Sequence, residues 1–124
     1  MRLIAGIALT LFAAPAAAQT MNAEVFYQRA AKLQKKGALA VFSGGEIKAL
    51  MGEVQAANKA VVAKLRADKA AGRKSRFCPP TGPQKMDSRE LMTRLSAIPE
   101  PDRRRIDMTE AMARIFEAKF PCRG

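Results

Sequence analysis

The spacing of apolar residues divides the chain into one uncharged apolar stretch, residues 3–14, and four amphipathic segments. From Ile47 to Leu65, apolar side chains recur every three or four residues, which places them on one face of an α-helix. No stretch alternates between apolar and polar residues as a half-buried strand does. The pattern predicts an all-α fold, a small bundle of about four helices. The expected helices cover residues 23–36, 44–72, 88–97 and 108–119.

Side chains at the predicted helix ends are of the types that cap helices. Asn22 precedes the first helix, and Asp87 and Asp107 precede the third and fourth. Their side-chain oxygens are expected to accept hydrogen bonds from free backbone N–H groups of the first turn. Ser43 and Glu46 have the spacing of a capping box at the start of the long second helix, so each side chain is expected to bind the other residue's backbone.

Two connectors interrupt the helical pattern. Residues 37–42 form a short apolar link, and we expect Leu39 and Phe42 to be buried beneath the helices. An exposed recognition loop is the alternative for this link. Residues 72–83 contain three prolines and a glycine within five positions, which forces an extended or turning path.

The uncharged stretch near the N-terminus has the organisation of a secretory signal peptide. Arg2 precedes it, Pro15 follows it, and Ala16-Ala17-Ala18 supplies the small residues that signal peptidase accepts, so we expect cleavage after Ala18. A membrane anchor is the alternative, but the stretch has roughly 12 residues against the ~20 that span a bilayer. We therefore expect a periplasmic or secreted protein with a single domain, residues 19–124.

The chain has two cysteines, Cys78 and Cys122. In an oxidising compartment an even number favours a disulfide, with two free buried thiols as the alternative. A bridge closes a loop of roughly 45 residues and stabilises the fold by about 4 kcal/mol in the chain-entropy model. The sequence has no histidine, and two thiolates alone do not complete a tetrahedral zinc shell, so no metal site is expected.

Charge and motif content favour a binding protein over an enzyme. No nucleophile elbow, phosphate loop or metal-binding motif occurs, and we expect neither catalysis nor a cofactor. Removal of Arg2 leaves 21 of the 22 basic residues against 11 acidic ones, and this net charge of about +10 favours acidic partners. Export and the lack of tryptophan argue against nucleic acid. The sharpest basic clusters, residues 73–76 and 103–105, lie in predicted connections and are either solvated surface or binding residues.

Prolines and cysteines form a pattern in the C-terminal half. Phe77-Cys78-Pro79-Pro80 opens it, Ile98-Pro99 follows a helix with Glu90-Leu91, and a last helix closes on Phe120-Pro121-Cys122. Residues 77–122 thereby resemble the Rap/Tai-type immunity domain, a family of exported helical proteins that are immunity partners of peptidoglycan amidase toxins delivered by type VI secretion. The middle helix lacks the Gly-Tyr pattern and preceding Cys of many members, so no second disulfide is expected.

The resemblance implies a mechanism of occlusion, in which the protein, as a homodimer, presents a loop to the active-site cleft of an amidase. By position and charge we expect this loop to be the segment Pro99–Asp107. The expected partner-binding residues are Pro99, Glu100, Asp102, Arg103, Arg104 and Arg105.

Two other functions fit the same composition. One is an envelope stress or chaperone-like protein, similar in plan to small acid-resistance periplasmic chaperones, and the other is a cationic binder of anionic envelope surfaces through charge alone.

Overall fold

The structure, a computed structural model, describes residues 20–123 of the chain. Within this range it contains helices and no β-strand, which confirms the all-α class. The four predicted helices are α1 (Ala23–Lys36), α2 (Gly44–Ala70), α3 (Ser88–Ala97) and α5 (Met108–Lys119). Two short elements accompany them, the 3₁₀-helix η1 (Gly37–Ser43) and the one-turn helix α4 (Glu100–Arg103). The predicted signal peptide, residues 1–18, lies outside the described residues.

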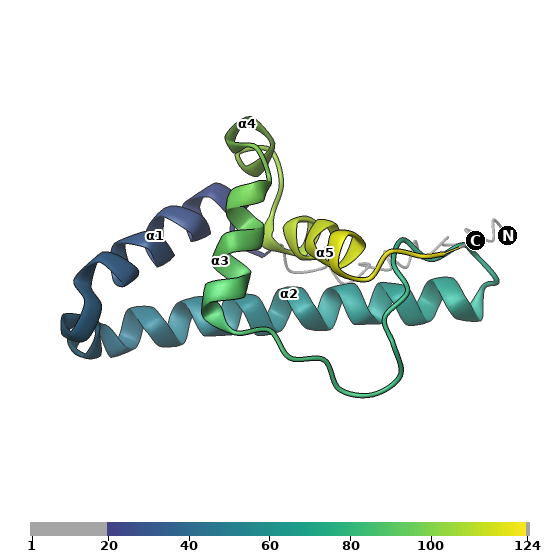
Figure 1. Cartoon of the computed structure of the whole chain (residues 1–124), viewed down its shortest axis with the longest axis horizontal. Helices are drawn as coiled ribbons and strands as arrows, with labels where there is room; N and C mark the ends of the chain where they lie inside the picture. Colours follow the sequence, from purple (N-terminus) through teal and green to yellow (C-terminus); the bar gives the residue numbers. More distant parts are fainter. Residues whose placement is uncertain (1–19, 124) are drawn as a thin grey trace, which may run out of the picture.

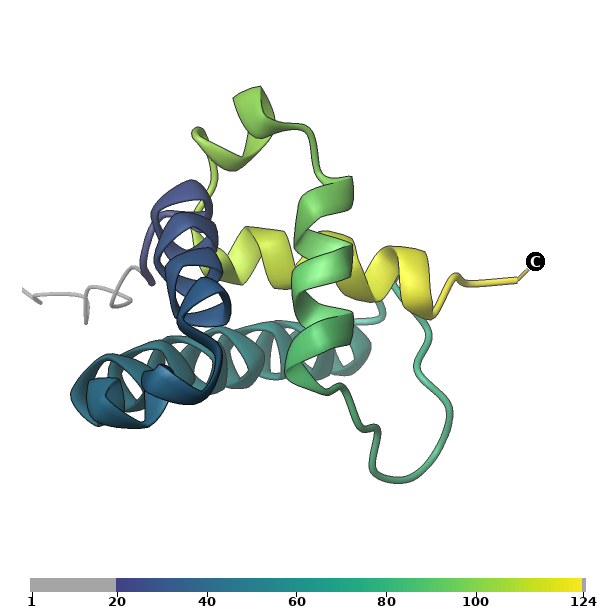
Figure 2. The same cartoon turned by 60° about the vertical axis from the view of Figure 1, so that its left-hand side comes forward.

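The long helix α2 forms a base on which the other helices lie (Figure 1). α1 runs back over one half of α2, and η1 joins the two in a helical hairpin. α5 packs against α2 in the most extensive contact between two elements, and α3 crosses beside it (Figure 2). α4 lies at the end of α3 that points away from α2, and the extended segment 71–87 leads from the end of α2 back to α3.

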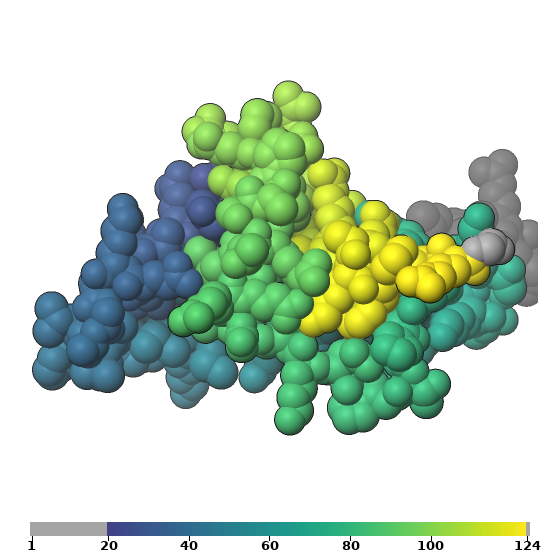
Figure 3. Space-filling view, in the orientation of Figure 1, coloured from purple at the N-terminus to yellow at the C-terminus, as the bar shows by residue number. Residues whose placement is uncertain are grey.

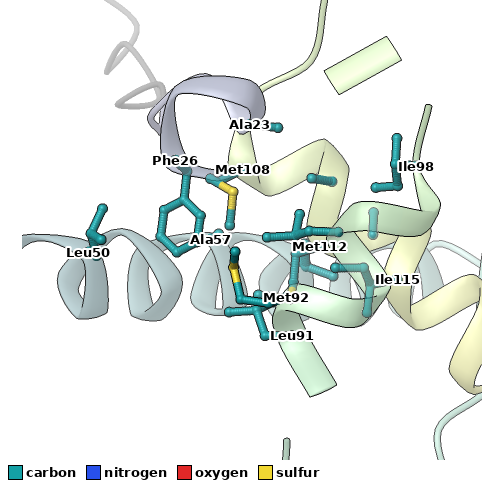
Figure 4. Packing of buried hydrophobic residues seen from close by; sticks show 14 of the residues in the cluster. Ala23, Phe26, Leu50, Ala57, Leu91, Met92, Ile98, Met108, Met112 and Ile115 are labelled. Carbon is teal, nitrogen blue, oxygen red and sulfur yellow. The ribbon is translucent and has the colours of Figure 1, made fainter. Parts of the chain in front are cut away.

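The apolar faces of α1, α2, α3 and α5 meet in one core (Figure 4). Ala57 and Val61 of α2 are buried, as the helical spacing predicts, and Leu95 and Met108 are the largest fully buried side chains. The small side chains of Ala57 and Ala111, both fully buried, let α2 and α5 approach closely. Each large core side chain contributes about 1.5–3 kcal/mol by leaving water, so this core holds the helices in one arrangement.

The predicted disulfide joins Cys78 to Cys122, with 4.9 Å between the Cα atoms, and the alternative of two free thiols is wrong. The backbone N–H of Cys78 also donates to the carbonyl of Phe120 at 2.8 Å. Next to the bridge, the buried ring of Phe77 lies 5.3 Å from that of Phe116, centre to centre. These contacts fasten the extended segment 71–87 to the end of α5.

The capping predictions are confirmed for three helices. Asn22, Asp87 and Asp107 each accept a hydrogen bond of 2.7–3.0 Å from a backbone N–H of the following first turn. The capping box of Ser43 and Glu46 is wrong, because Ser43 makes no side-chain hydrogen bond to the first turn of α2. Both side chains instead bind cationic side chains of α1, so they tie the two arms of the hairpin together.

The expected burial of the apolar link between α1 and α2 is also wrong. Leu39 is 65% exposed and Phe42 is 85% exposed. Met51, expected on the core face of α2, is 57% exposed as well. The physical reason is position, since η1 turns at the outer end of the hairpin, where neither α3 nor α5 reaches it (Figure 1).

Candidate partner-binding site

Residues 98–107, which we call the apex segment, project from the molecule at the end farthest from α2 (Figure 1). The prolines of Pro99-Glu100-Pro101 do end α3, but the chain then forms the one-turn helix α4. This turn is closed by backbone hydrogen bonds of 2.9–3.1 Å from residues 102–105 to the carbonyls of residues 99, 100 and 102. The segment singled out from sequence is therefore an ordered protrusion.

Arg103 lies inside this protrusion and has only 7% of its surface exposed. Its Nε donates to Glu24 Oε2 of α1 at 2.6 Å, and its Nη1 donates to the carbonyl of Ile98 at 2.6 Å. Its guanidinium also stacks over the ring of Tyr27, 4.3 Å from the centre. The burial of the Arg103 side chain and the use of its Nε and Nη1 within the chain argue against the predicted contact of this residue with a partner.

The Arg103–Glu24 pair is a buried ion pair with satisfied hydrogen bonds. Burial alone would raise the pKa of Glu24. The hydrogen bonds from Arg103 and Gln28, together with the charge of Arg103, outweigh burial, so the pKa of Glu24 lies below the usual value of a glutamate. Glu24 is therefore ionised at neutral pH, and its hydrogen bond with Arg103 compensates for the burial of both charges.

The base of the apex segment is joined to the chain that precedes α1. Asn22 Nδ2 donates to the carbonyl of Arg104 at 2.9 Å, while the Oδ1 of the same side chain caps α1. The backbone N–H of Ala23 donates to Ile106 at 3.0 Å, and that of Met108 donates to Met21 at 2.8 Å. One side chain and two backbone bonds thus fix the protrusion to an element about 80 residues away in sequence.

The exposed charges of the apex segment form a mixed surface. Arg104 donates to Glu100 at 2.7 Å, and both side chains are more than half exposed. Asp102 lies 3.5 Å from Arg114 of α5. Arg105 is exposed and forms no ion pair with any described residue. Of the six residues expected to bind a partner, all except Arg103 thus retain partly or fully exposed side chains.

The second basic cluster, residues 73–76, is mostly engaged within the molecule. Arg73 pairs with Asp68 at 2.9 Å. Arg76 makes two hydrogen bonds of 2.8 and 2.9 Å to Glu110 and one to Glu117, and these bonds raise the pKa of its guanidinium. The cluster therefore holds the start of the extended segment 71–87 against α2 and α5, and the apex segment is the better candidate for a binding site.

Two apolar grooves lie along α2. The first is bounded mainly by α2, α5 and the segment 77–86, and the second by α1, α2 and α3. Their cavity volumes are about 440 and 420 Å³. The four residues common to both linings are Val54, Gln55, Met86 and Leu91, so the grooves are neighbours. Their size is in the range of pockets that bind small apolar ligands or side chains of a partner.

The described residues contain no group of three His, Cys, Asp or Glu side chains placed to hold a metal ion. Within the same range, no helix is long and apolar enough to cross a membrane. Comparison of the chain with protein families, with curated proteins and with solved structures gives no match. Any account of function therefore depends on the geometry and on the sequence resemblance described above.

Proposed function

We propose that this chain is an exported, non-catalytic binding protein that inserts its apex segment into a cleft of a protein partner. The observation that carries the proposal is the anchoring of this protrusion by the buried Arg103–Glu24 pair. A segment that already has its bound shape loses little conformational entropy on binding. More of the interaction energy of its exposed side chains is then available as binding free energy. Convex, rigid segments of this kind are suited to occlude concave sites.

The partner we propose is a peptidoglycan amidase delivered by type VI secretion. The support is the resemblance of residues 77–122 to the Rap/Tai-type immunity domain, since the apex segment lies within that range. Inhibition by this route requires no catalytic residue in this chain. The inserted segment would exclude peptidoglycan from the amidase cleft by occupying it.

Arg104 and Arg105 are the side chains proposed to make the charged contacts. Both are exposed, and Arg104 retains free donors besides the one it uses on Glu100. A guanidinium binds carboxylates through two parallel hydrogen bonds, which favours a partner with acidic residues at the rim of its cleft. The net charge of about +10 for residues 19–124 would accelerate association with such a partner at low salt.

The test starts with capture of partners from a periplasmic extract by the tagged chain, followed by purification of any captured amidase. Titration of the chain against its peptidoglycan hydrolysis should give stoichiometric inhibition. Arg104→Glu/Arg105→Glu should weaken inhibition at least tenfold. The matched control Arg66→Glu/Lys69→Glu, on the exposed face of α2, makes the same change in net charge and should inhibit as the wild type does. A captured amidase that is not inhibited, or no captured amidase, would contradict the proposal.

A chaperone-like function is the second candidate, and the two apolar grooves favour it. Exposed apolar grooves in a cationic protein suit unfolded segments of other proteins. Suppression of light scattering by reduced, denatured lysozyme measures this activity. Val62→Asp, at the wall of the first groove, should abolish it, while Val25→Asp on α1 should not. Failure of the wild-type chain to suppress scattering would exclude this function.

A further inference from the structure

The outer end of the α1–α2 hairpin carries an exposed apolar cluster that the proposed partner-binding function does not use. We call Leu39, Val41 and Phe42 the apolar tip, and their exposed fractions are 65%, 73% and 85%. They come from η1, which forms the end of the molecule on the left of Figure 3. Clustered large apolar side chains in water are unfavourable, so such a cluster usually marks a contact surface.

Positive charge surrounds the apolar tip. The exposed lysines in the neighbouring turns of α1 and α2 are Lys32, Lys35, Lys36 and Lys48. None of them takes part in an ion pair with a described residue, and Lys36 donates to the Ser43 hydroxyl at 2.9 Å, which leaves its charge uncompensated. This hydrogen bond joins the two ends of η1 and fixes how the tip projects.

The acidic residue next to the apolar tip does not offset these lysines. Glu46 accepts two hydrogen bonds from Arg29, and the longer is 2.6 Å. The hydrogen bond from Arg29 lowers the pKa of Glu46, so the pair is fully ionised and neutral as a unit. The end of the hairpin therefore presents apolar side chains with a positively charged rim.

We infer that the apolar tip docks onto a phospholipid bilayer that carries anionic headgroups. Leu39, Val41 and Phe42 would enter the boundary of headgroups and acyl chains, and the lysines behind them would lie at the level of the phosphates. Charge complementarity favours a bilayer over a second copy of the chain as the partner of the apolar tip. A second copy of the chain would have to meet the same patch with its own, which brings lysines against lysines. A bilayer offers an apolar interior below a layer of negative charge, which matches both features.

A tryptophan reporter tests insertion directly, because the chain contains no tryptophan. Phe42→Trp should show a blue shift of emission with vesicles that contain phosphatidylglycerol, and quenching by brominated acyl chains. The matched reporter Val25→Trp, at the start of α1 away from the tip, should show neither change. Emission from Trp at position 42 that does not change on vesicle binding, or changes equally at position 25, would overturn the inference.

Charge variants separate the tip from the net charge of the whole chain. Lys35→Glu/Lys48→Glu should weaken sedimentation with phosphatidylglycerol vesicles at least tenfold at physiological salt. Arg66→Glu/Lys69→Glu changes the total charge equally on the other half of α2 and should weaken it less than threefold. Leu39→Ser/Phe42→Ser should also reduce binding at least tenfold, and pure phosphatidylcholine vesicles should bind weakly. Equal losses from both charge pairs would overturn the inference, as would concentration-dependent dimerisation that the Leu39→Ser/Phe42→Ser variant abolishes.

Discussion

The apex segment and the apolar tip both connect two helices and project from the core, but they are stabilised in opposite ways. The apex segment is held from within by the buried pair of Arg103 and Glu24 and exposes charged side chains. The apolar tip lies beside exposed or half-exposed polar contacts between the hairpin arms, from Lys36 to Ser43 and from Arg29 to Glu46, and it exposes apolar side chains. Polar groups inside and apolar groups outside reverse the usual distribution, and this reversal distinguishes both regions from ordinary connecting turns.

Substitutions in the apex segment and in the apolar tip therefore differ in their structural consequences. Removal of a buried charge at the apex leaves its partner unpaired in a site with little water, which costs much stability. Removal of an exposed apolar side chain at the tip leaves the core unchanged.

The largest effect is expected for Arg103→Ala. It leaves the Glu24 carboxylate buried without its main partner, and the free energy of unfolding should fall by about 3–5 kcal/mol. Urea unfolding followed by circular dichroism measures this change. Arg104→Ala is the control on the neighbouring exposed side chain and should change stability by less than about 0.5 kcal/mol. Equal effects of the two variants would show that burial of Arg103 does not hold the apex.

A smaller effect is expected for Asn22→Ala. The substitution removes the N-cap of α1 and the hydrogen bond to the Arg104 carbonyl at the same time. Loss of the cap alone costs about 1 kcal/mol, and the second bond should bring the total to about 2 kcal/mol. The matched variant Asp87→Ala removes only a helix cap and should cost about 1 kcal/mol. Identical losses would indicate that the bond to the apex contributes nothing.

The pH dependence of stability should reflect Glu24. Its folded-state pKa is lowered below the reference value of 4.5, so the unfolded chain binds the proton more tightly than the folded chain does. Glu24 therefore adds stability above that reference value, and this contribution disappears as the pH falls through the folded-state pKa. Glu24→Gln should show a shallower loss of stability between about pH 5 and 3 than the wild type. Unfolding titrations across that range give the slopes, and equal slopes would contradict the assignment.

The smallest effect on stability is expected at the tip. Phe42→Ser replaces a side chain that is already 85% exposed, so the free energy of unfolding should change by less than about 0.5 kcal/mol. A core variant such as Leu95→Ala should cost about 2–5 kcal/mol in the same assay. A large loss for Phe42→Ser would mean that the side chain packs against the fold and is not available to a membrane.

Most of the fold is predictable from local sequence. The helix bounds follow from apolar spacing together with caps such as Asn22 and Asp107, which act within one turn. The disulfide follows from two cysteines and an expected oxidising compartment. These features depend on residues that are close together in the sequence or on the number of cysteines. They can therefore be predicted without knowing the tertiary structure.

The burial of Arg103 was not predictable in the same way. Three consecutive arginines carry no local signal that distinguishes the first, Arg103, from the other two, and its partner Glu24 is 79 residues away. The one available hint is that Glu24 and Tyr27 lie three residues apart on α1, so they share a face that can receive a guanidinium. The exposure of Leu39 and Phe42 likewise depends on how far α3 reaches along the hairpin, which no local pattern encodes.

Native-state hydrogen exchange measures directly whether the apex segment is a rigid protrusion. The amides of Arg103 and Arg104 donate to the carbonyls of Pro99 and Glu100 at 3.0 and 3.1 Å. If the buried pair holds the turn, these two amides should exchange on the slow timescale of α5, and Arg103→Ala should speed their exchange at least a hundredfold. Exchange in the wild type as fast as in the exposed segment 81–85 would show that the buried pair does not hold the apex segment.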